Sequence, residues 1–276
     1  MITLATVYNR KSLTLQCLTS LLHSCKIAEV ESTHFVVDDN STDGTSEAIA
    51  RLFPEVCLLR GTGSLYWAGG MRFGFNHLSN IEYDYLLAYN DDCVFAPNCL
   101  ELLLGGFDSS SDRIGIVVGS LAQPDSKTVS YGGRRARWRS NWLPPSFSLI
   151  NPADFNYVPI DTFNMNICCI SNELIRSIGF LSDRFKHSAA DYDYGMRANN
   201  AGFKTVLAPG IVGSCQSNST LGTSKEKSIH PFVRIRREFS VKEYPFSSIL
   251  FYFRSHGGYL WPLWLLVFYI TRIFKF

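Results

Sequence analysis

Tyr85-Leu-Leu-Ala-Tyr-Asn-Asp-Asp-Cys-Val-Phe95 joins an apolar run of strand length to the polar triplet Asn90-Asp91-Asp92. Acidic side chains at the C-terminal end of a buried strand lie where open α/β sheets bind their ligands. Two carboxylates and an amide at that position form an oxygen-rich site suited to Mg²⁺ or Mn²⁺ carrying phosphate groups. A strand followed by an Asx-rich turn explains the same residues without a metal, so the rest of the chain decides between these two interpretations.

The segments before this strand alternate between strand and helix patterns. Strands are predicted at Ile2–Val7, His34–Val37, Val56–Leu59 and Tyr85–Tyr89. Helices are predicted at Leu13–Leu22, from Thr45 to just before Pro54, and at Met71–Leu78. Short strands that alternate with helices predict a mostly parallel, doubly wound α/β sheet with helices on both faces.

Four polar or glycine-rich groups follow the four predicted strands. They are Thr6-Val-Tyr-Asn-Arg10, Asp38-Asp39-Asn40, Gly61–Gly70 and Asn90-Asp91-Asp92. Because the carboxyl ends of parallel strands meet at one edge of a sheet, these groups are predicted to form one pocket. A glycine-rich loop before a helix lets backbone N–H groups approach a phosphate. This loop does not read G-x-G-x-x-G, and the chain has no G-x-x-x-x-G-K-[ST] pattern, so neither a dinucleotide site nor a P-loop is predicted.

The second half of the chain carries three further features. The strand Ile114–Val118 precedes an irregular, basic and aromatic insertion made of Arg134–Arg139 and Pro144–Pro152. Asp191–Ala201 is predicted to be a helix, because Gly202 follows as a C-terminal stop. The Ser- and Thr-rich stretch that begins at Gln216 is predicted to be a mobile loop.

The overall composition limits the classes of function. With 46% hydrophobic and 18% charged residues, the 276 residues can build one large α/β domain, with or without an appendage. The net charge of +2 and the lack of a basic tract argue against nucleic-acid binding. Eight scattered cysteines without a C-x-x-C pair favour reduced thiols in the cytosol over disulfides or zinc. Met1 leads directly into a predicted strand rather than a signal peptide, so we expect a cytoplasmic catalytic part.

The stretch Tyr259–Ile270 is apolar and aromatic, and Arg272 and Lys275 follow it. Its uncharged core is shorter than the roughly 20 apolar residues that a membrane-spanning helix needs. Trp and Tyr among leucines, with cations beside them, favour a helix that lies in the bilayer interface. A helix docked on the domain and a subunit contact in a homodimer are the alternatives. We expect peripheral binding to the inner face of the cytoplasmic membrane.

Five motifs of the chain resemble those of the nucleotide-sugar-dependent glycosyltransferases of family 2, which have the GT-A fold. The motifs are Thr6–Arg10, Val36–Thr45, Gly63–Gly74, Asn90–Asp92 and Phe185–Gly202. The resemblance covers residues 1–210 and does not extend well into the C-terminal segment. It implies a GT-A catalytic domain at 1–215, with a nucleotide-binding half at 1–95 and an acceptor half at 96–215. A mobile loop at 216–230 and a helical, membrane-proximal appendage at 231–276 would follow.

The resemblance also implies roles for the matched residues. Asp191 falls on the catalytic base, and Asp193 and Arg197 support its helix. Asp92 is the principal ligand of Mg²⁺ or Mn²⁺, and Asn90 is a second ligand. The nucleotide of a dTDP- or UDP-sugar is bound by Thr6, Tyr8, Asn9, Arg10, Asp38, Asp39, Gly69, Gly70, Arg72, Asn90 and Asp91.

Within the implied nucleotide site, Asp39 accepts a hydrogen bond from the pyrimidine ring, and the glycine loop with Arg72 lies near the diphosphate. Asp191 accepts the proton of an acceptor hydroxyl as that hydroxyl attacks the anomeric carbon, which inverts this centre. The metal ion neutralises the leaving diphosphate.

Three positions depart from the family pattern. Ala190 stands where the family usually has Glu, Asn90 stands at the first Asp of D-x-D, and Gly213-Ser214-Cys215 replaces a common histidine. The first two departures leave an inactive nucleotide- or glycan-binding module as an alternative. A nucleotidyltransferase of related fold is another.

The acceptor is inferred from two stretches of the sequence, of which one is basic and the other is apolar. Arginines at 134–139 suit a diphosphate group, because Arg pairs well with phosphate oxygens, although a solvated basic hairpin is the alternative. Together with the interfacial C-terminus, they favour a polyprenyl-diphosphate-linked glycan. Gly63–Met71 looks most similar to rhamnosyltransferase-like members that build bacterial surface polysaccharides such as O-antigen.

Overall fold

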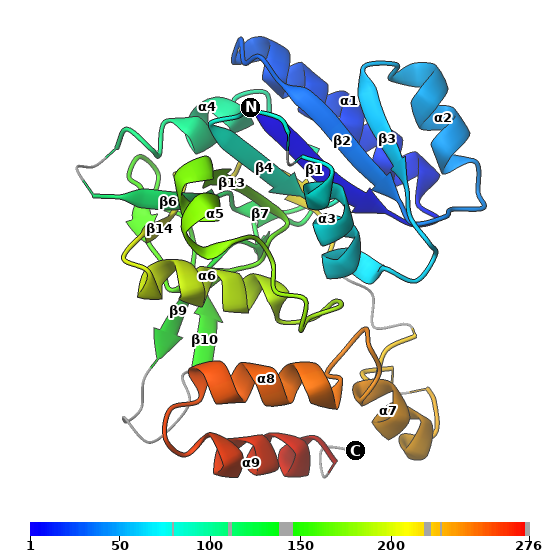
Figure 1. The fold of residues 1–276 in the computed structure, drawn as a ribbon, viewed down its shortest axis with the longest axis vertical. Helices are drawn as coiled ribbons and strands as arrows, with labels where there is room; N and C mark the ends of the chain where they lie inside the picture. The colour runs from blue at the N-terminus through cyan, green and yellow to red at the C-terminus, as the bar shows by residue number, and fades with distance from the viewer. Residues whose placement is uncertain (79, 110–111, 138–145, 218–221, 227, 274–276) are drawn as a thin grey trace.

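A wide sheet forms the centre of the molecule, and the C-terminal helices lie beneath it in the view of Figure 1. The computed structural model describes residues 1–78, 80–109, 112–137, 146–217, 222–226 and 228–273.

The central sheet has eight strands in the order β11-β14-β6-β13-β4-β1-β2-β3. Their bounds are β1 Ile2–Val7, β2 Thr33–Asp38, β3 Val56–Arg60, β4 Tyr85–Tyr89, β6 Ile114–Val118, β11 Val158–Pro159, β13 Ile167–Ser171 and β14 Lys204–Leu207. The neighbours β3, β2, β1 and β4 are parallel, as are β6 and β14. β13 runs antiparallel to β4 and β6, and β11 runs antiparallel to β14. The predicted, mostly parallel α/β sheet is confirmed, and the antiparallel strands are an addition to it.

Helices cover both faces of this sheet (Figure 1). They are α1 Lys11–Ile27, α2 Thr45–Leu52, α3 Tyr66–Asn76, α4 Cys99–Leu104, α5 Asn172–Ile178 and α6 Ala190–Asn200. Residues of α3, α5 and α6 share one hydrophobic core, residues of α1 and α4 share a second, and residues of α1 and α2 share a smaller third.

β4 is apolar throughout because both of its faces are buried. Leu86 and Ala88 belong to the core of α3, α5 and α6, whereas Leu87 and Tyr89 belong to the core of α1 and α4. A central strand that is covered on both faces is expected to be a continuous apolar run. The polar triplet begins at the residue after β4, so it emerges at the carboxyl edge of the sheet.

Two small sheets extend this framework. One contains β5 Cys93–Phe95, β7 Leu121–Ala122, β8 Val129–Tyr131 and β15 Gly213–Cys215, and the other contains β9 Gly133–Arg137, β10 Ser146–Leu149 and β12 Thr162–Phe163. The insertion that was predicted to be irregular therefore contains a hairpin, in which Arg134 pairs with Leu149. Trp138, Arg139 and Pro144 of that insertion lie outside the described residues.

The C-terminal helical unit consists of α7 Pro231–Glu238, α8 Phe246–His256 and α9 Trp261–Ile273. Its helices pack through aromatic rings, with Phe239 and Tyr269 stacked at 5.1 Å and Phe253 edge-on to Phe268 at 5.5 Å. Within the described ranges, no helix combines the length and the apolar character needed to cross a bilayer. Lys275 lies outside the described residues.

The predicted mobile loop at 216–230 is described only in part, and its mobility stays a prediction. Ser224 in this loop donates a hydrogen bond through Oγ to Glu238 and to Glu243, the latter at 2.6 Å. The described part of the loop is thus joined to the C-terminal helical unit.

Gly70, in the first half of α3, allows close packing. The helix begins at Tyr66, so the predicted loop at 61–70 is wrong in its second half, and Gly69 and Gly70 lie inside the helix. A Cβ atom on Gly70 would lie 2.9 Å from Cβ of Thr6, which is closer than two carbon atoms can pack. Gly70 therefore lets α3 approach β1.

Gly70→Ala is expected to lower the free energy of unfolding by about 1–3 kcal/mol, because the added methyl group has no space against Thr6. The neighbouring Gly69→Ala is the matched control, since its Cβ would meet nothing closer than 3.5 Å. That variant is expected to leave stability unchanged or raise it by up to about 1 kcal/mol, because Gly is a poor helix former. Urea unfolding measures both, and equal effects would contradict the packing role.

Candidate active site

A single cavity of about 1380 Å³ lies at the carboxyl edge of the parallel strands. The residues predicted from sequence that line it are Thr6, Tyr8, Arg10, Asp39, Asn90, Asp91, Asp92 and Asp191. The predicted residues that do not line it are Asn9, Asp38, Gly69, Gly70, Arg72, Asp193 and Arg197. The expectation that distant strand ends form one pocket is thus met, and it extends to the helix that carries Asp191.

The triplet after β4 is held by Arg10. Nη1 of Arg10 donates to Oδ1 of Asp91 at 3.2 Å and to Oδ2 of Asp92 at 2.8 Å. Burial raises the pKa of Asp91 to about 7, and the positive charge of Arg10 opposes this shift. Asp91 points into the protein, where Thr14 donates to its second oxygen at 3.4 Å, whereas Asp92 keeps a side chain that is 16% exposed. Both carboxylates line the cavity, and Asp92 is the more exposed of the two.

The acidic pair after β2 organises the loops around the cavity. Asp39 accepts hydrogen bonds from the backbone N–H groups of Gly63 at 2.7 Å and Leu65 at 2.9 Å. Asp38 is buried and accepts from the backbone N–H of Ser41 at 2.8 Å. Asn9 connects this turn to the end of β1, since its Oδ1 accepts from the backbone N–H of Thr42 at 2.7 Å.

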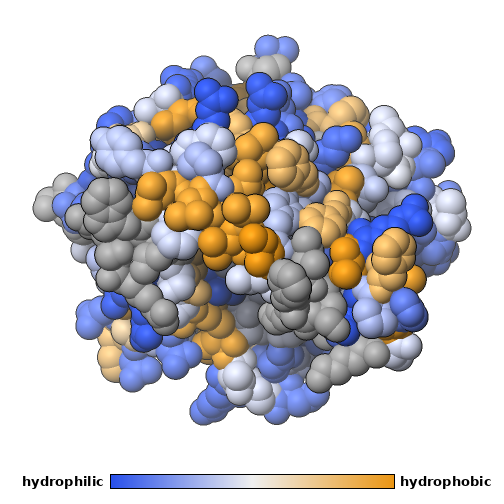
Figure 2. All heavy atoms as spheres, turned by 90° about the horizontal axis from the view of Figure 1, so that it is seen from below, coloured by the Kyte–Doolittle hydropathy of each residue, from blue (hydrophilic) through white to orange (hydrophobic). Residues whose placement is uncertain are grey.

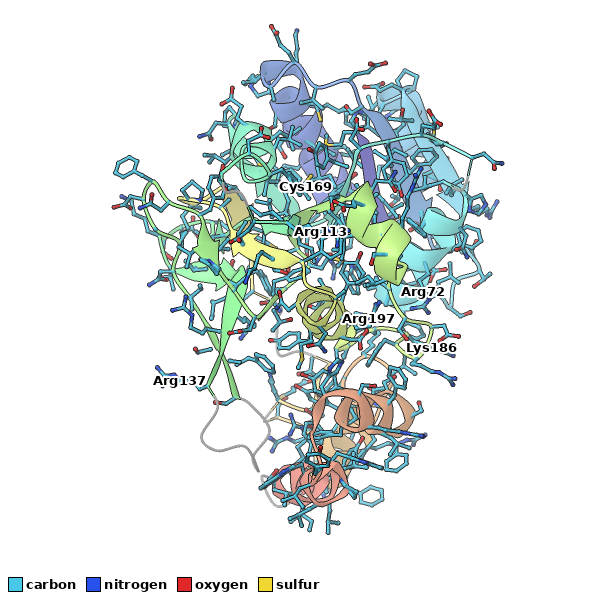
Figure 3. All side chains as sticks on the ribbon, turned by 60° about the vertical axis from the view of Figure 1, so that its left-hand side comes forward. Arg72, Arg113, Arg137, Cys169, Lys186 and Arg197 are labelled. Atoms are coloured by element: carbon cyan, nitrogen blue, oxygen red, sulfur yellow. The ribbon has the colours of Figure 1, made fainter. Side chains whose placement is uncertain are left out.

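Arg72 holds the segment before α6 in place through hydrogen bonds and does not line the cavity of about 1380 Å³. Its Nη1 donates to the backbone carbonyls of Ser182 at 2.8 Å and Phe185 at 2.6 Å. The same segment accepts a hydrogen bond from the backbone N–H of Ala68 to the carbonyl of Lys186 at 3.1 Å. Figure 3 shows Arg72 and Lys186 close together at this junction. Arg72 and Gly69 line a second, smaller cavity on this side of α3, and the expected diphosphate contact of these residues stays a prediction.

Asp191 is the second carboxyl group of the cavity whose pKa is raised towards neutrality by burial. It lies in the first turn of α6, and its Oδ1 accepts from the backbone N–H of Tyr192 at 2.9 Å. Burial raises its pKa to about 6, against the opposing effect of hydrogen bonds from the backbone N–H groups of Tyr192 and Met165. A carboxyl group with a pKa near neutrality can accept a proton from a substrate at physiological pH.

Asp193 is buried with both carboxylate oxygens engaged. Nε2 of His256, from α8, lies 2.9 Å from Oδ1, and Nε of Arg197 donates to Oδ2 at 2.8 Å. The side chains of His256 and Asp193 are only 4% and 1% exposed. Arg197, labelled in Figure 3, also donates to the backbone carbonyls of Ile178 and Phe180. The helix of the base candidate is thus joined to the domain on one side and to the C-terminal helical unit on the other.

The C-terminal helical unit forms a wall of the cavity, which the sequence did not predict. The lining residues from this unit and its connecting segments are Lys242, Glu243, Tyr244, Ile249, Tyr252, Phe253, His256, Gly257, Phe268 and Arg272. The predicted appendage is therefore part of the site. Aromatic content was the only sequence signal in this region, and it does not distinguish a cavity wall from a membrane surface.

His256→Ala is expected to lower the free energy of unfolding by about 1–3 kcal/mol, because it leaves a buried oxygen of Asp193 without its partner. It should also speed amide hydrogen exchange in α6, which loses one of its contacts with α8. His77→Ala is the control, because His77 is exposed, follows directly after α3, and has a ring nitrogen 2.8 Å from the carbonyl of Phe73 in that helix. An effect on α6 no larger than that of the control would show that the contact is dispensable.

Comparison with known proteins extends these observations. By structure, the chain is similar to the mannosyltransferase PcManGT from Pyrobaculum calidifontis in complex with GDP-Man and Mn²⁺, with a TM-score of 0.59 and 16% identity over 98% of this chain and 73% of that one. It is also similar to TarS 1–349 from S. aureus, with a TM-score of 0.57 and 14% identity over 86% of this chain and 71% of that one. Among curated proteins, none matches the sequence significantly. These likenesses confirm the GT-A fold.

The family described as Glycosyl transferase family 2 matches residues 4–171, from β1 to the end of β13. The match includes all four strand ends of the cavity and covers more than half of the chain. The chain therefore belongs to glycosyl transferase family 2.

Proposed function

We propose that this chain is an inverting glycosyltransferase that moves a sugar from a nucleoside-diphosphate sugar to an acceptor hydroxyl. The observation that carries the proposal is the position of Asp191, in the first turn of α6 and in the one cavity that Asp39 and the triplet also line. Burial raises the pKa of this carboxyl group to about 6. A general base works best when its pKa lies near the working pH.

The nucleotide is proposed to bind where β1 and β2 end. Thr6, Tyr8 and Asp39 line the cavity there. Asp39 would contact the base and also fix the loop at Gly63 around it, since it already accepts a hydrogen bond from that backbone. PcManGT binds GDP-Man. For this chain we propose a dTDP- or UDP-sugar, and rhamnose as the sugar because of the sequence at Gly63–Met71.

The triplet fits a divalent cation, which we propose to be held by Asp92 and Asn90. Oδ1 of Asn90 is buried and has no hydrogen-bond partner among the described residues. A buried oxygen without a partner is costly, and a cation of the Mg²⁺ or Mn²⁺ type would satisfy it. When bound, the ion supplies positive charge for the leaving diphosphate.

Asp191 would accept the proton of the acceptor hydroxyl as the hydroxyl oxygen attacks the anomeric carbon. A glycosidic bond forms, the bond to the diphosphate breaks, and the diphosphate leaves with the electron pair. The contacts of Asp193 with His256 and Arg197 hold the first turn of α6, so Asp191 keeps its orientation. A single displacement of this kind inverts the anomeric centre.

A polyprenyl-diphosphate-linked glycan of cell-surface polysaccharide synthesis is the proposed acceptor. Tyr244 and Tyr252 on the C-terminal wall offer aromatic faces for sugar rings, and Lys242 adds a cation to the cavity lining. Arg134 donates to Oδ1 of Asn164 at 3.0 Å and lies over the ring of Tyr192, so it supports the surroundings of the base.

Asp191→Asn is expected to lower glycosyl transfer by a factor on the order of 10²–10⁴, because the amide cannot accept the proton. The wild-type rate should fall as the pH drops below about 6, where Asp191 becomes protonated. Incubation with a panel of nucleotide sugars, followed by quantification of released nucleoside diphosphate and glycosylated product, measures both effects and identifies the donor.

The free energy of unfolding of the Asp191→Asn variant distinguishes loss of the catalytic base from loss of the fold. The pKa of Asp191 is about 6 in the folded chain, against the ordinary value of 3.8. The folded state therefore loses stability relative to the unfolded chain as the pH rises from 3.8 to about 6 and Asp191 ionises. Asp191→Asn avoids this cost and should raise the free energy of unfolding at about pH 7. A folded variant with full transfer activity would contradict the proposal. A nucleotidyltransferase would instead release pyrophosphate from a nucleoside triphosphate, and an inactive module would bind donors without turnover.

We also propose that α9 lies in the bilayer interface at the inner face of the cytoplasmic membrane. Leu263, Leu266, Val267 and Ile270 follow helical spacing and are each 36–56% exposed. Figure 2, which views the molecule from below, shows hydrophobic residues gathered on this side. An amphipathic helix with such an apolar face binds the boundary between lipid headgroups and acyl chains.

The double variant Leu263→Gln/Leu266→Gln is expected to weaken binding to anionic lipid vesicles by at least about tenfold, because two apolar side chains no longer leave water. Cosedimentation with vesicles measures the bound fraction. Phe155→Gln is the control, since Phe155 is 88% exposed and lies outside the C-terminal helical unit. Unchanged binding would contradict membrane contact, and a dimer that the double variant dissociates would indicate the subunit contact instead.

A further inference from the structure

Two cysteines face each other behind Asp92. β5 and β15 pair antiparallel, and Cys93 is the direct register partner of Cys215. Both side chains are buried, at 0% and 2% exposure. The two residues are more than 100 positions apart in the chain, so no C-x-x-C spacing signals them.

Both sulfur atoms point at the same carboxylate oxygen. Sγ of Cys215 lies 3.5 Å from Oδ1 of Asp92, and Sγ of Cys93 lies 4.0 Å from it. The three ligand atoms lie within 4.8 Å of one another, and no other group of three such side chains is found among the residues that the structure describes. Oδ2 of Asp92 is bonded to Arg10, so the two oxygens of this carboxylate face different partners.

We propose that Asp92, Cys93 and Cys215 form a divalent-cation site with one oxygen and two sulfur ligands. The inference rests on the proposed cation at Asp92 and changes the expected identity of that ion. Ligands at roughly 2.1 Å (oxygen) and 2.3 Å (sulfur) from a tetrahedral zinc ion lie about 3.6 Å apart. The observed separations of 3.5 and 4.0 Å need little adjustment to meet this geometry.

Sulfur ligands determine which ions the site prefers. Mg²⁺ takes oxygen ligands, whereas cysteine sulfur selects Zn²⁺ and similar softer ions. Binding releases the thiol protons to solvent. Asp92 lines the cavity, which provides an access route. A tetrahedral ion with three protein ligands keeps a fourth position for water or a substrate oxygen.

Titration of metal-free, reduced protein with Cd²⁺ or Co²⁺ tests this site, because both ions give a thiolate-to-metal charge-transfer absorption. The wild type should show this band, saturating at one ion per chain and persisting in excess Mg²⁺. Cys215→Ser and Cys93→Ser should each diminish the band and weaken binding by on the order of 100-fold. Asp92→Asn should weaken binding while the thiols remain. Cys57→Ser, at an exposed thiol in β3, is the control and should keep the full band.

Absence of the band in the wild type would overturn the proposal, as would a band that survives both buried substitutions and disappears with Cys57→Ser. Circular dichroism, together with Cys215→Ala as a second variant, separates ligand loss from unfolding. The readout needs no sugar donor. A band without transfer from any nucleotide sugar would therefore leave the cation site standing and refute the proposed function. Transfer supported by Mg²⁺ in a protein that shows no band would refute the cation site and leave the proposed function standing.

Discussion

Burial of β4 on both faces is the constraint on which the rest of the site depends. Its side chains alternate between the two larger hydrophobic cores, so no polar residue can be placed before the strand ends. The chain becomes polar at Asn90, at the edge where β1 and β2 also end. Two adjacent carboxylates at that point repel each other, and Arg10 from the end of β1 lies between them and reduces the repulsion. The buried strand thus confines the charged side chains of the triplet to the carboxyl edge of the sheet.

The two carboxyl groups with raised pKa values differ in what surrounds them. Asp91 and Asp191 are both shifted mainly by burial. Asp91 is directly bonded to Arg10, which fixes it as a structural member of the triplet. Asp191 is bonded through its oxygen to the backbone of its own helix and lines the open cavity. Both carboxyl groups line the cavity, and the ion pair with Arg10 is what distinguishes the surroundings of Asp91 from those of Asp191. Similar pKa shifts therefore accompany the different roles that we propose for the two groups.

The sequence predicted those features of the site that depend on residues close together in the chain. The ends of β1, β2 and β4 could be predicted because an apolar run followed by polar residues is visible in a short window. The packing of Gly70 could not be predicted, because it depends on Thr6, a residue 64 positions earlier. His256 was not identified, because its partner Asp193 lies 63 positions away, outside any local pattern. The pairing of Cys93 with Cys215 is hidden for the same reason.

The C-terminal helical unit has two different faces, and this arrangement links the proposed membrane contact to the proposed chemistry. On α9, Phe268 and Arg272 line the cavity, whereas Leu263 and Leu266 are exposed on the surface. Arg272 also pairs with Glu238 of α7 at 2.8 Å, so α9 helps to hold the unit together. Truncation before α9 would remove the apolar stripe and a cavity wall at once, and its effects could not be assigned to either. Substitutions confined to the outer face separate the two, because Leu263 and Leu266 do not line the cavity. If α9 binds lipid as proposed, an acceptor carried by the bilayer would meet the cavity beside this helix.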